Sequence, residues 1–156
     1  MTLHRKSDNK FEYWETWEKD ENSSIIHFGI VGDKGETVIL EKPFNERKDI
    51  LKSELKKRVE EGYLPIAEDN FETIVIEYLV TENAHVDLEK RNKLESRLNE
   101  FLGWNGLGKC DGGSSGKNTL EVFCLVVDYD LAYKLITEDL TNSEFSDYSR
   151  IYQQAD

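Results

Sequence analysis

Two kinds of hydrophobic periodicity divide the chain into short elements. Alternation of apolar and polar side chains, or a short apolar run between turn residues, predicts strands at residues 11–18, 25–32, 36–41, 71–80 and 119–128. Apolar residues three or four positions apart predict helices at residues 46–61, from Asp87 to about 102, and at 131–140. Residues 150–152 are expected to form a short closing strand.

The order of these elements predicts an α+β protein with two halves. Residues 1–10 are charged and turn-forming, which indicates a flexible tail. Residues 11–66 are expected to form an antiparallel sheet with one helix, which begins after Asn45 as N-cap and ends before Gly62. After a linker, the β-α-β-α-β order of residues 71–156 predicts a ferredoxin-like half.

The stretch of residues 103–118 holds six of the ten glycines and one of the two cysteines. Part of it, residues 111–118, is close to a phosphate-binding loop, but Asp111 replaces the first glycine and Asn118 the final hydroxyl residue. A phosphate loop also leaves a strand and enters a helix, whereas this stretch is expected to do the reverse. We therefore interpret it as a helix-to-strand connector with no cofactor.

The N-terminal half resembles the WGR domain over residues 11–63. The match rests on Gly29, the turn of residues 32–35 and the Gly62-Tyr63 pair that ends the helix. Phe28 and Ile30 stand where that family has Trp and Arg. The resemblance implies a sheet covered by one helix and an association with nucleic acid, but Ile30 lacks the guanidinium that would contact phosphate. The C-terminal half resembles uncharacterised small bacterial proteins, which implies no activity.

The nucleophilic and metal-binding residues form no recognisable motif. Cys110 and Cys124 are expected to be reduced thiols, although their spacing leaves a disulfide open, and no histidine is linked by a motif to Cys110. A divalent-cation site from Asp111, Asp128 and Asp130 is an alternative to their use in turns and helix caps. We expect no catalytic residue, no metal and no enzymatic activity.

The charge of the chain indicates the kind of partner. Asp and Glu number 32 against 20 Lys and Arg, a formal net charge of −12. This field repels a phosphodiester backbone and attracts a basic protein. The polar N-terminus and the lack of a run of about 18 apolar residues predict a cytoplasmic protein with no membrane segment.

One segment combines aromatic and acidic residues in a way that suits binding. Trp14 and Trp17 are three positions apart, so a regular strand cannot turn both to one face. An exposed tryptophan beside acidic residues would recognise a basic, partly apolar surface. The candidate binding residues are Glu12, Trp14, Glu15, Trp17, Glu18 and Asp111. Packing of both tryptophans on the helix at 46–61 is the alternative.

These patterns favour a non-catalytic cytoplasmic binding protein. A specific form is an immunity-type inhibitor that presents acidic residues to a basic nuclease toxin. The alternative is a nucleic-acid-associated accessory protein with a divergent WGR domain. It would bind through a basic helix stripe formed by Lys52, Lys56, Lys57 and Arg58.

Overall fold

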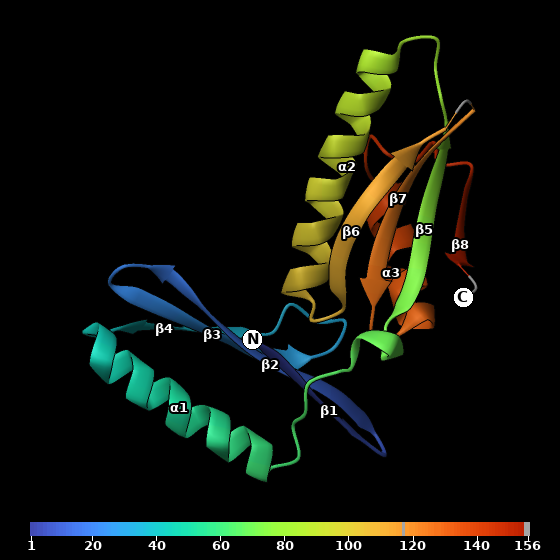
Figure 1. The fold of residues 1–156 in the computed structure, drawn as a ribbon. Helices are drawn as coiled ribbons and strands as arrows, with labels where there is room; N and C mark the ends of the chain where they lie inside the picture. The colour runs from blue at the N-terminus through green and yellow to red at the C-terminus, as the bar shows by residue number, and fades with distance from the viewer. Residues whose placement is uncertain (117, 155–156) are drawn as a thin grey trace. The chain divides into compact units, whose positions relative to one another are not determined.

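The computed structural model describes residues 1–116 and 118–154 of the chain. It contains two compact units, Met1–Ala67 and Glu68–Asp156, each built on one four-stranded antiparallel sheet (Figure 1). The α+β class predicted from the hydrophobic pattern is confirmed. The boundary between the two units follows Ala67 and lies in the short linker expected between the two predicted halves.

The N-terminal unit is a four-stranded meander followed by one helix. Its strands pair in chain order, β1-β2-β3-β4, so each strand is joined to its neighbour by a short turn. The elements are β1 (Thr2–Ser7), β2 (Lys10–Asp20), β3 (Ser23–Ile30), β4 (Glu36–Glu41) and α1 (Phe44–Glu60).

The prediction of a flexible tail at residues 1–10 is wrong, because β1 pairs with β2 along its whole length. A two-residue turn at Asp8 and Asn9 joins the two strands. Leu3 lies opposite Trp14, and both side chains are buried. The terminal amine of Met1 also donates to the carbonyl of Thr16 at 3.0 Å. Only Leu3 of this segment contributes to the hydrophobic core. The segment therefore has few apolar residues, and its sequence resembles that of a flexible tail.

The hydrophobic core of the N-terminal unit lies between α1 and one face of the sheet. It is formed by Leu3, Trp14, Ile26 and Tyr63, with Leu51, Leu55, Phe28 and Leu40 packed against it. Tyr63 reaches this core because the helix ends at Glu60, just before Gly62 as predicted, and the Tyr63 amide donates to the carbonyl of Arg58. The prediction of Asn45 as N-cap is wrong: Pro43 holds that position, with no side-chain capping bond.

The C-terminal unit contains four strands and two long helices. The elements are β5 (Glu72–Leu79), α2 (Ala84–Trp104), β6 (Gly108–Ser115), β7 (Thr119–Val126), α3 (Tyr129–Thr141) and β8 (Arg150–Gln154), preceded by a short 3₁₀ helix (Glu68–Asn70). The strand order is β6-β7-β5-β8, and every neighbouring pair is antiparallel.

The main error in the predicted element order concerns the glycine-rich stretch of residues 103–118. It is no simple connector, because Gly108–Ser115 forms the edge strand β6 against β7. The observed order is therefore β-α-β-β-α-β, not β-α-β-α-β. Gly108 has φ +147°, and a Cβ there would overlap the carbonyl of Leu125, so the strand can start only with glycine. The pairing then shifts register between Cys110 and Gly113.

The starts of both long helices follow the capping rules. Asn83 caps α2 and accepts from the amides of His85 and Val86, so the helix begins at Ala84, earlier than the predicted start at Asp87. Asp87 instead accepts from the Thr81 amide, inside the first turn. Asp128 caps α3, as its position before the apolar stripe indicates.

The core of the C-terminal unit is formed by the side chains on one face of the central strands. β5 and β7 lie side by side with Ile74 opposite Cys124 and Ile76 opposite Val122, and all four are fully buried. The helices contribute the buried residues Leu94, Leu98, Leu102, Ala132, Ile136 and Leu140. The opposite face of the sheet is more polar, since Glu77 forms an ion pair there with Arg150 at 2.8 Å.

Candidate functional site

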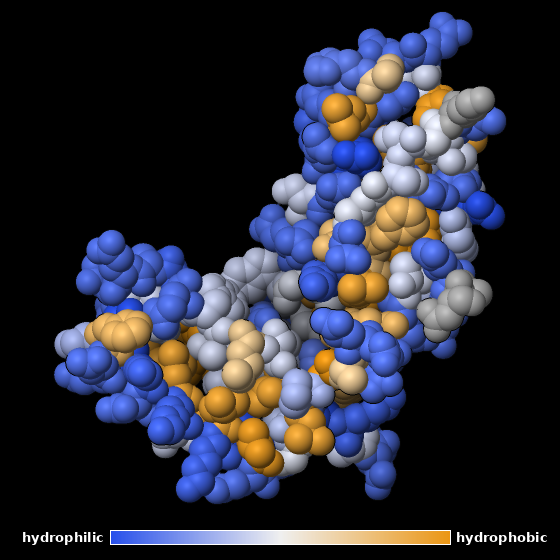
Figure 2. All heavy atoms as spheres, in the orientation of Figure 1, coloured by the Kyte–Doolittle hydropathy of each residue, from blue (hydrophilic) through white to orange (hydrophobic). Residues whose placement is uncertain are grey.

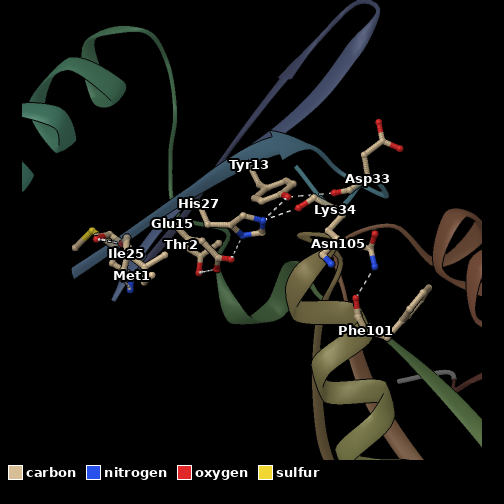
Figure 3. Close-up of polar contacts among 11 residues, drawn as sticks. Met1, Thr2, Tyr13, Glu15, Ile25, His27, Asp33, Lys34, Phe101 and Asn105 are labelled. Carbon is tan, nitrogen blue, oxygen red and sulfur yellow. Dashed lines mark hydrogen bonds and ion pairs between the residues drawn. The ribbon is translucent and has the colours of Figure 1, made fainter. Parts of the chain in front are cut away.

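A buried polar cluster occupies the face of the N-terminal sheet that points away from α1 (Figure 3). The register places Glu15 of β2 directly opposite His27 of β3, with Tyr13 next to them on the same face. His27 Nδ1 lies 2.7 Å from Glu15 Oε1, and Nε2 lies 2.6 Å from the carbonyl oxygen of Lys34. The Tyr13 hydroxyl lies 3.1 Å from His27 Nε2 and donates to the carbonyl of Asp33.

This cluster fastens the turn of residues 32–35 to the sheet. Gly35 has φ +67°, and a Cβ there would overlap the Tyr13 hydroxyl and the carbonyl of Phe28. Burial raises the pKa of the Tyr13 hydroxyl, with a further contribution from the charges of Glu15 and Asp33. His27 is fully buried. Both ring nitrogens are used within the unit, by Glu15 and by the carbonyl of Lys34, so the cluster holds the turn in place.

The two tryptophans predicted as binding residues lie on opposite faces of β2. Trp14 is fully buried in the core beside α1, so its assignment to a binding surface is wrong. Trp17 is 38% exposed on the other face, and its ring edge packs against the His27 ring at 6.1 Å between centroids. One tryptophan serves the core, and the other is accessible to a partner.

Two of the predicted acidic residues are neutralised on the α1 side of the sheet. Glu12 accepts from Arg5 at 2.6 Å. Glu18 accepts from the buried Arg47 at 3.0 Å and from the hydroxyl of Ser24. Because both carboxylates are used within the unit and lie on the face opposite Trp17, they do not form one site with it.

The other two acidic residues have different surroundings. Glu15 shares the face of Trp17 but is half-buried and holds His27 and the hydroxyl of Thr2. Asp111 is exposed on β6 of the C-terminal unit, beside Cys110. The five predicted binding residues of the N-terminal unit therefore do not form one site, and Asp111 belongs to the other unit.

An apolar row that sequence reasoning did not identify crosses the sheet at Trp17. Trp17 lies opposite Ile25 of β3, which lies opposite Ile39 of the edge strand β4. We call Trp17, Ile25 and Ile39 the Trp17 row. Ile39 is 47% exposed, and Ile25 is buried. An exposed tryptophan and isoleucine in register form a contact surface of the kind that partners bury.

Acidic positions flank the Trp17 row on both sides. The row of paired residues on one side contains Glu15 and His27. The row on the other side contains Asp20 and Glu41, which both pair with Ser23. Hydrogen bonds from the amide of Asn22 and from Ser23 lower the pKa of Asp20, so its carboxylate stays charged. The apolar row thus has an acidic rim, formed by Asp20 and Glu41 on one side and, on the other, by Glu15, whose carboxylate also contacts His27 and Thr2.

The basic residues predicted to form a stripe on α1 are partly neutralised. Lys56 lies 3.9 Å from Glu60, and Arg58 pairs with Glu54 and Glu61. Lys52 and Lys56 line an open groove along α1 together with Leu55 and Val59. Figure 2 shows apolar atoms among charged ones on this side of the N-terminal unit.

Within residues 1–116 and 118–154, no group of three or more His, Cys, Asp or Glu side chains is arranged to hold a metal ion. No helix in this part of the chain is long and apolar enough to cross a membrane. The chain matches no known family model, no curated protein and no solved structure.

Proposed function

We propose that this chain is a non-catalytic binding protein whose Trp17 row receives a basic protein partner. The observation that carries the proposal is the exposed Trp17, aligned with Ile39 and flanked by the carboxylates of Glu15, Asp20 and Glu41. Tryptophan is one of the residues enriched among binding hot spots, which cluster near the centre of an interface, and a rim of one charge selects a partner of the other.

The distribution of charge supports a basic partner. The N-terminal unit has 12 Lys and Arg against 14 Asp and Glu, a net charge of −2, whereas the C-terminal unit has 8 against 18, a net charge of −10. Most of the negative field therefore comes from the C-terminal unit. In this proposal the Trp17 row provides the specific contact, and the C-terminal unit accelerates the encounter with a basic protein.

A more specific form of the proposal is an immunity-type inhibitor of a basic nuclease toxin. Its support is the acidic rim together with the lack of a catalytic cluster among the described residues, where the best candidate, His27, is buried. We also propose that the N-terminal unit is WGR-like, from its meander, its Gly62-Tyr63 helix end and its Gly32 and Gly35 turn. The β6-β7-β5-β8 order of the C-terminal unit supports a ferredoxin-like assignment.

The test is capture of the partner by the full chain from the cells that produce it. The wild type is compared with Trp17→Ser and with the control Leu79→Ser, which removes an apolar side chain that is 70% exposed in the C-terminal unit. We expect a protein of high isoelectric point that the wild type and Leu79→Ser retain and Trp17→Ser loses. Equal retention by all three proteins, or retention of acidic proteins only, would overturn the proposal.

The second candidate function is nucleic-acid binding by α1. The specific observation in its favour is that α1 has six Lys and Arg against four Asp and Glu, inside a unit with little net charge. We expect DNA retardation at low salt, lost steeply with added salt, if this function holds. The variant Lys52→Glu/Lys57→Glu would abolish it. Absence of retardation at low salt removes this candidate and leaves the first unaffected.

A further inference from the structure

The two cysteines lie directly opposite each other on paired strands. Cys110 of β6 is the register partner of Cys124 of β7, and their sulfur atoms are 2.9 Å apart. Both are free thiols. Directly opposite residues of an antiparallel pair have Cα atoms about 4.5–5.5 Å apart, which is inside the range of about 4.4–6.8 Å that a disulfide requires. The two thiols therefore already have a backbone spacing that permits a bond.

The two thiols differ in access. Cys124 is fully buried in the core of the C-terminal unit. Cys110 is half-buried and lines an open hollow with Asn92, Glu95, Ser96, Asn99 and Gly112. A small oxidant from solvent can reach Cys110 and cannot reach Cys124. Contact with Cys110 and burial both raise the pKa of the Cys124 thiol, so this thiol stays protonated until its neighbour has reacted.

The hollow also selects the kind of oxidant. Glu95 lines it, paired with Arg91 at 3.3 Å, and the unit around it has a net charge of −10. An anionic disulfide such as oxidised glutathione is repelled by this field, whereas hydrogen peroxide is neutral and small. The edge position of β6 and its register shift between Cys110 and Gly113 allow the strand to adjust when the sulfur atoms approach.

We propose that Cys110 and Cys124 form a peroxide-reactive dithiol site that closes to a disulfide between β6 and β7. The Cys110 thiolate attacks one oxygen of hydrogen peroxide, the O–O bond breaks, and hydroxide leaves, which gives a sulfenic acid at Cys110. The hydroxide takes up the proton that the Cys110 thiol gave to solvent and becomes the first water. The Cys124 sulfur then attacks the Cys110 sulfur, the S–O bond breaks, and the hydroxyl leaves with the Cys124 proton as the second water. Both sulfur atoms are oxidised by one electron each, and one peroxide is reduced to two waters.

The test uses the reduced full chain treated with an equal amount of hydrogen peroxide and quenched with iodoacetamide before unfolding. We expect the two thiols to be lost together, an intact mass lower by two hydrogens, and a peptide that links Cys110 to Cys124 within one chain. Dithiothreitol should restore both thiols. Oxygen added to Cys110 with the Cys124 thiol intact, a disulfide between two chains, or no reaction would each overturn the proposal.

Two variants test the order of the steps. In Cys124→Ser, dimedone should trap a sulfenic acid at Cys110, because no second thiol is present to remove it. In Cys110→Ser, the buried Cys124 should remain unreacted over the same time. Oxidation of Cys124 in that folded variant would overturn the assignment of Cys110 as the attacked thiol. If either variant fails to fold, the peptide map of the wild type still decides the proposal.

Discussion

Trp14 and Trp17 are residues of the same type with different roles in this protein. Both lie on β2, three positions apart, and the pleat turns them to opposite faces. Trp14 fills the core beside α1, whereas Trp17 is partly exposed between Glu15 and Asp20. The side chain that holds the fold and the side chain offered to a partner can therefore be separated by mutation.

Replacing each tryptophan by alanine should have different effects on stability. We expect Trp14→Ala to lower the free energy of unfolding of the N-terminal unit by about 3–5 kcal/mol, because it leaves a large cavity. Trp17→Ala should lower it by a smaller amount, because the side chain is 38% exposed in the folded protein and its removal leaves no enclosed cavity. Urea unfolding followed by circular dichroism measures both. Equal losses for the two variants would contradict the assignment of faces.

The pH dependence of stability should reveal the buried Tyr78. Burial raises the pKa of its hydroxyl, which donates to the carbonyl of Phe145 at 2.8 Å. In the unfolded chain a tyrosine ionises at about pH 10. The folded protein keeps the proton longer, so the stability from this group is present below that pH and is lost as the pH rises through it.

We therefore expect wild-type stability to fall from about pH 8.5 to about pH 10.5, and to fall less in Tyr78→Phe. That variant should also lose about 1 kcal/mol at neutral pH, because the Phe145 carbonyl loses its donor. Urea unfolding at both pH values gives the two slopes. The same alkaline slope in both proteins would show that Tyr78 does not hold its proton in the folded state.

The sequence predicted only in part which side chains of β2 face the core. The pleat required that one tryptophan leave the core, but the choice between them depends on which face α1 covers. That choice is made by Leu51, Leu55 and Tyr63, which are distant in sequence from β2. The pairing of Ile39 with Ile25, and hence the Trp17 row, likewise depends on strand register, which the isolated strand patterns do not specify.

At the scale of elements, the two strands that the sequence analysis missed, β1 and β6, are both edge strands. An edge strand contributes few residues to the core, so its pattern is weak: β1 has Leu3 and β6 has Cys110 as the side chains nearest the interior. The strong central strands, β5 and β7, were predicted to within a few residues because their apolar runs are long. Turn chemistry at Asp8 and Asn9 was the signal available for β1.

Replacing Gly108 or Gly103 by alanine should change the stability of the C-terminal unit in different ways. Gly108 adopts φ +147° against the Leu125 carbonyl, so Gly108→Ala should destabilise the C-terminal unit by about 2–4 kcal/mol. Gly103 lies in the last turn of α2 with open space around it, and Gly103→Ala should be neutral or stabilise the unit by up to about 1 kcal/mol. Thermal unfolding compares them. A milder effect at Gly108 than at Gly103 would contradict the close approach of β6 to β7.

At the scale of the whole molecule, charge is unequally divided between the units, with net charges of −2 and −10. Long-range attraction of a basic protein is a rate effect, which salt screens within about 10 Å at 0.1 M. The apolar contact of Trp17 is insensitive to salt by comparison. The two parts of the proposed function therefore separate into association and dissociation rates.

The association rate with the captured partner should fall by on the order of tenfold or more between about 0.02 M and about 0.5 M salt, with a much smaller change in the dissociation rate. Surface plasmon resonance at several salt concentrations measures both rates. An association rate that does not depend on salt would show that the acidic charge has no part in recognition.

The central claim is that the Trp17 row is the contact surface, and one affinity measurement tests it most directly. The dissociation constant of the captured partner is measured for the wild type, Trp17→Ala and the control Leu79→Ala, after circular dichroism confirms that all three are folded. Loss of a hot-spot tryptophan costs about 2 kcal/mol or more, so Trp17→Ala should weaken binding by about 30-fold or more, with Leu79→Ala unchanged. Equal dissociation constants for all three proteins would contradict the claim.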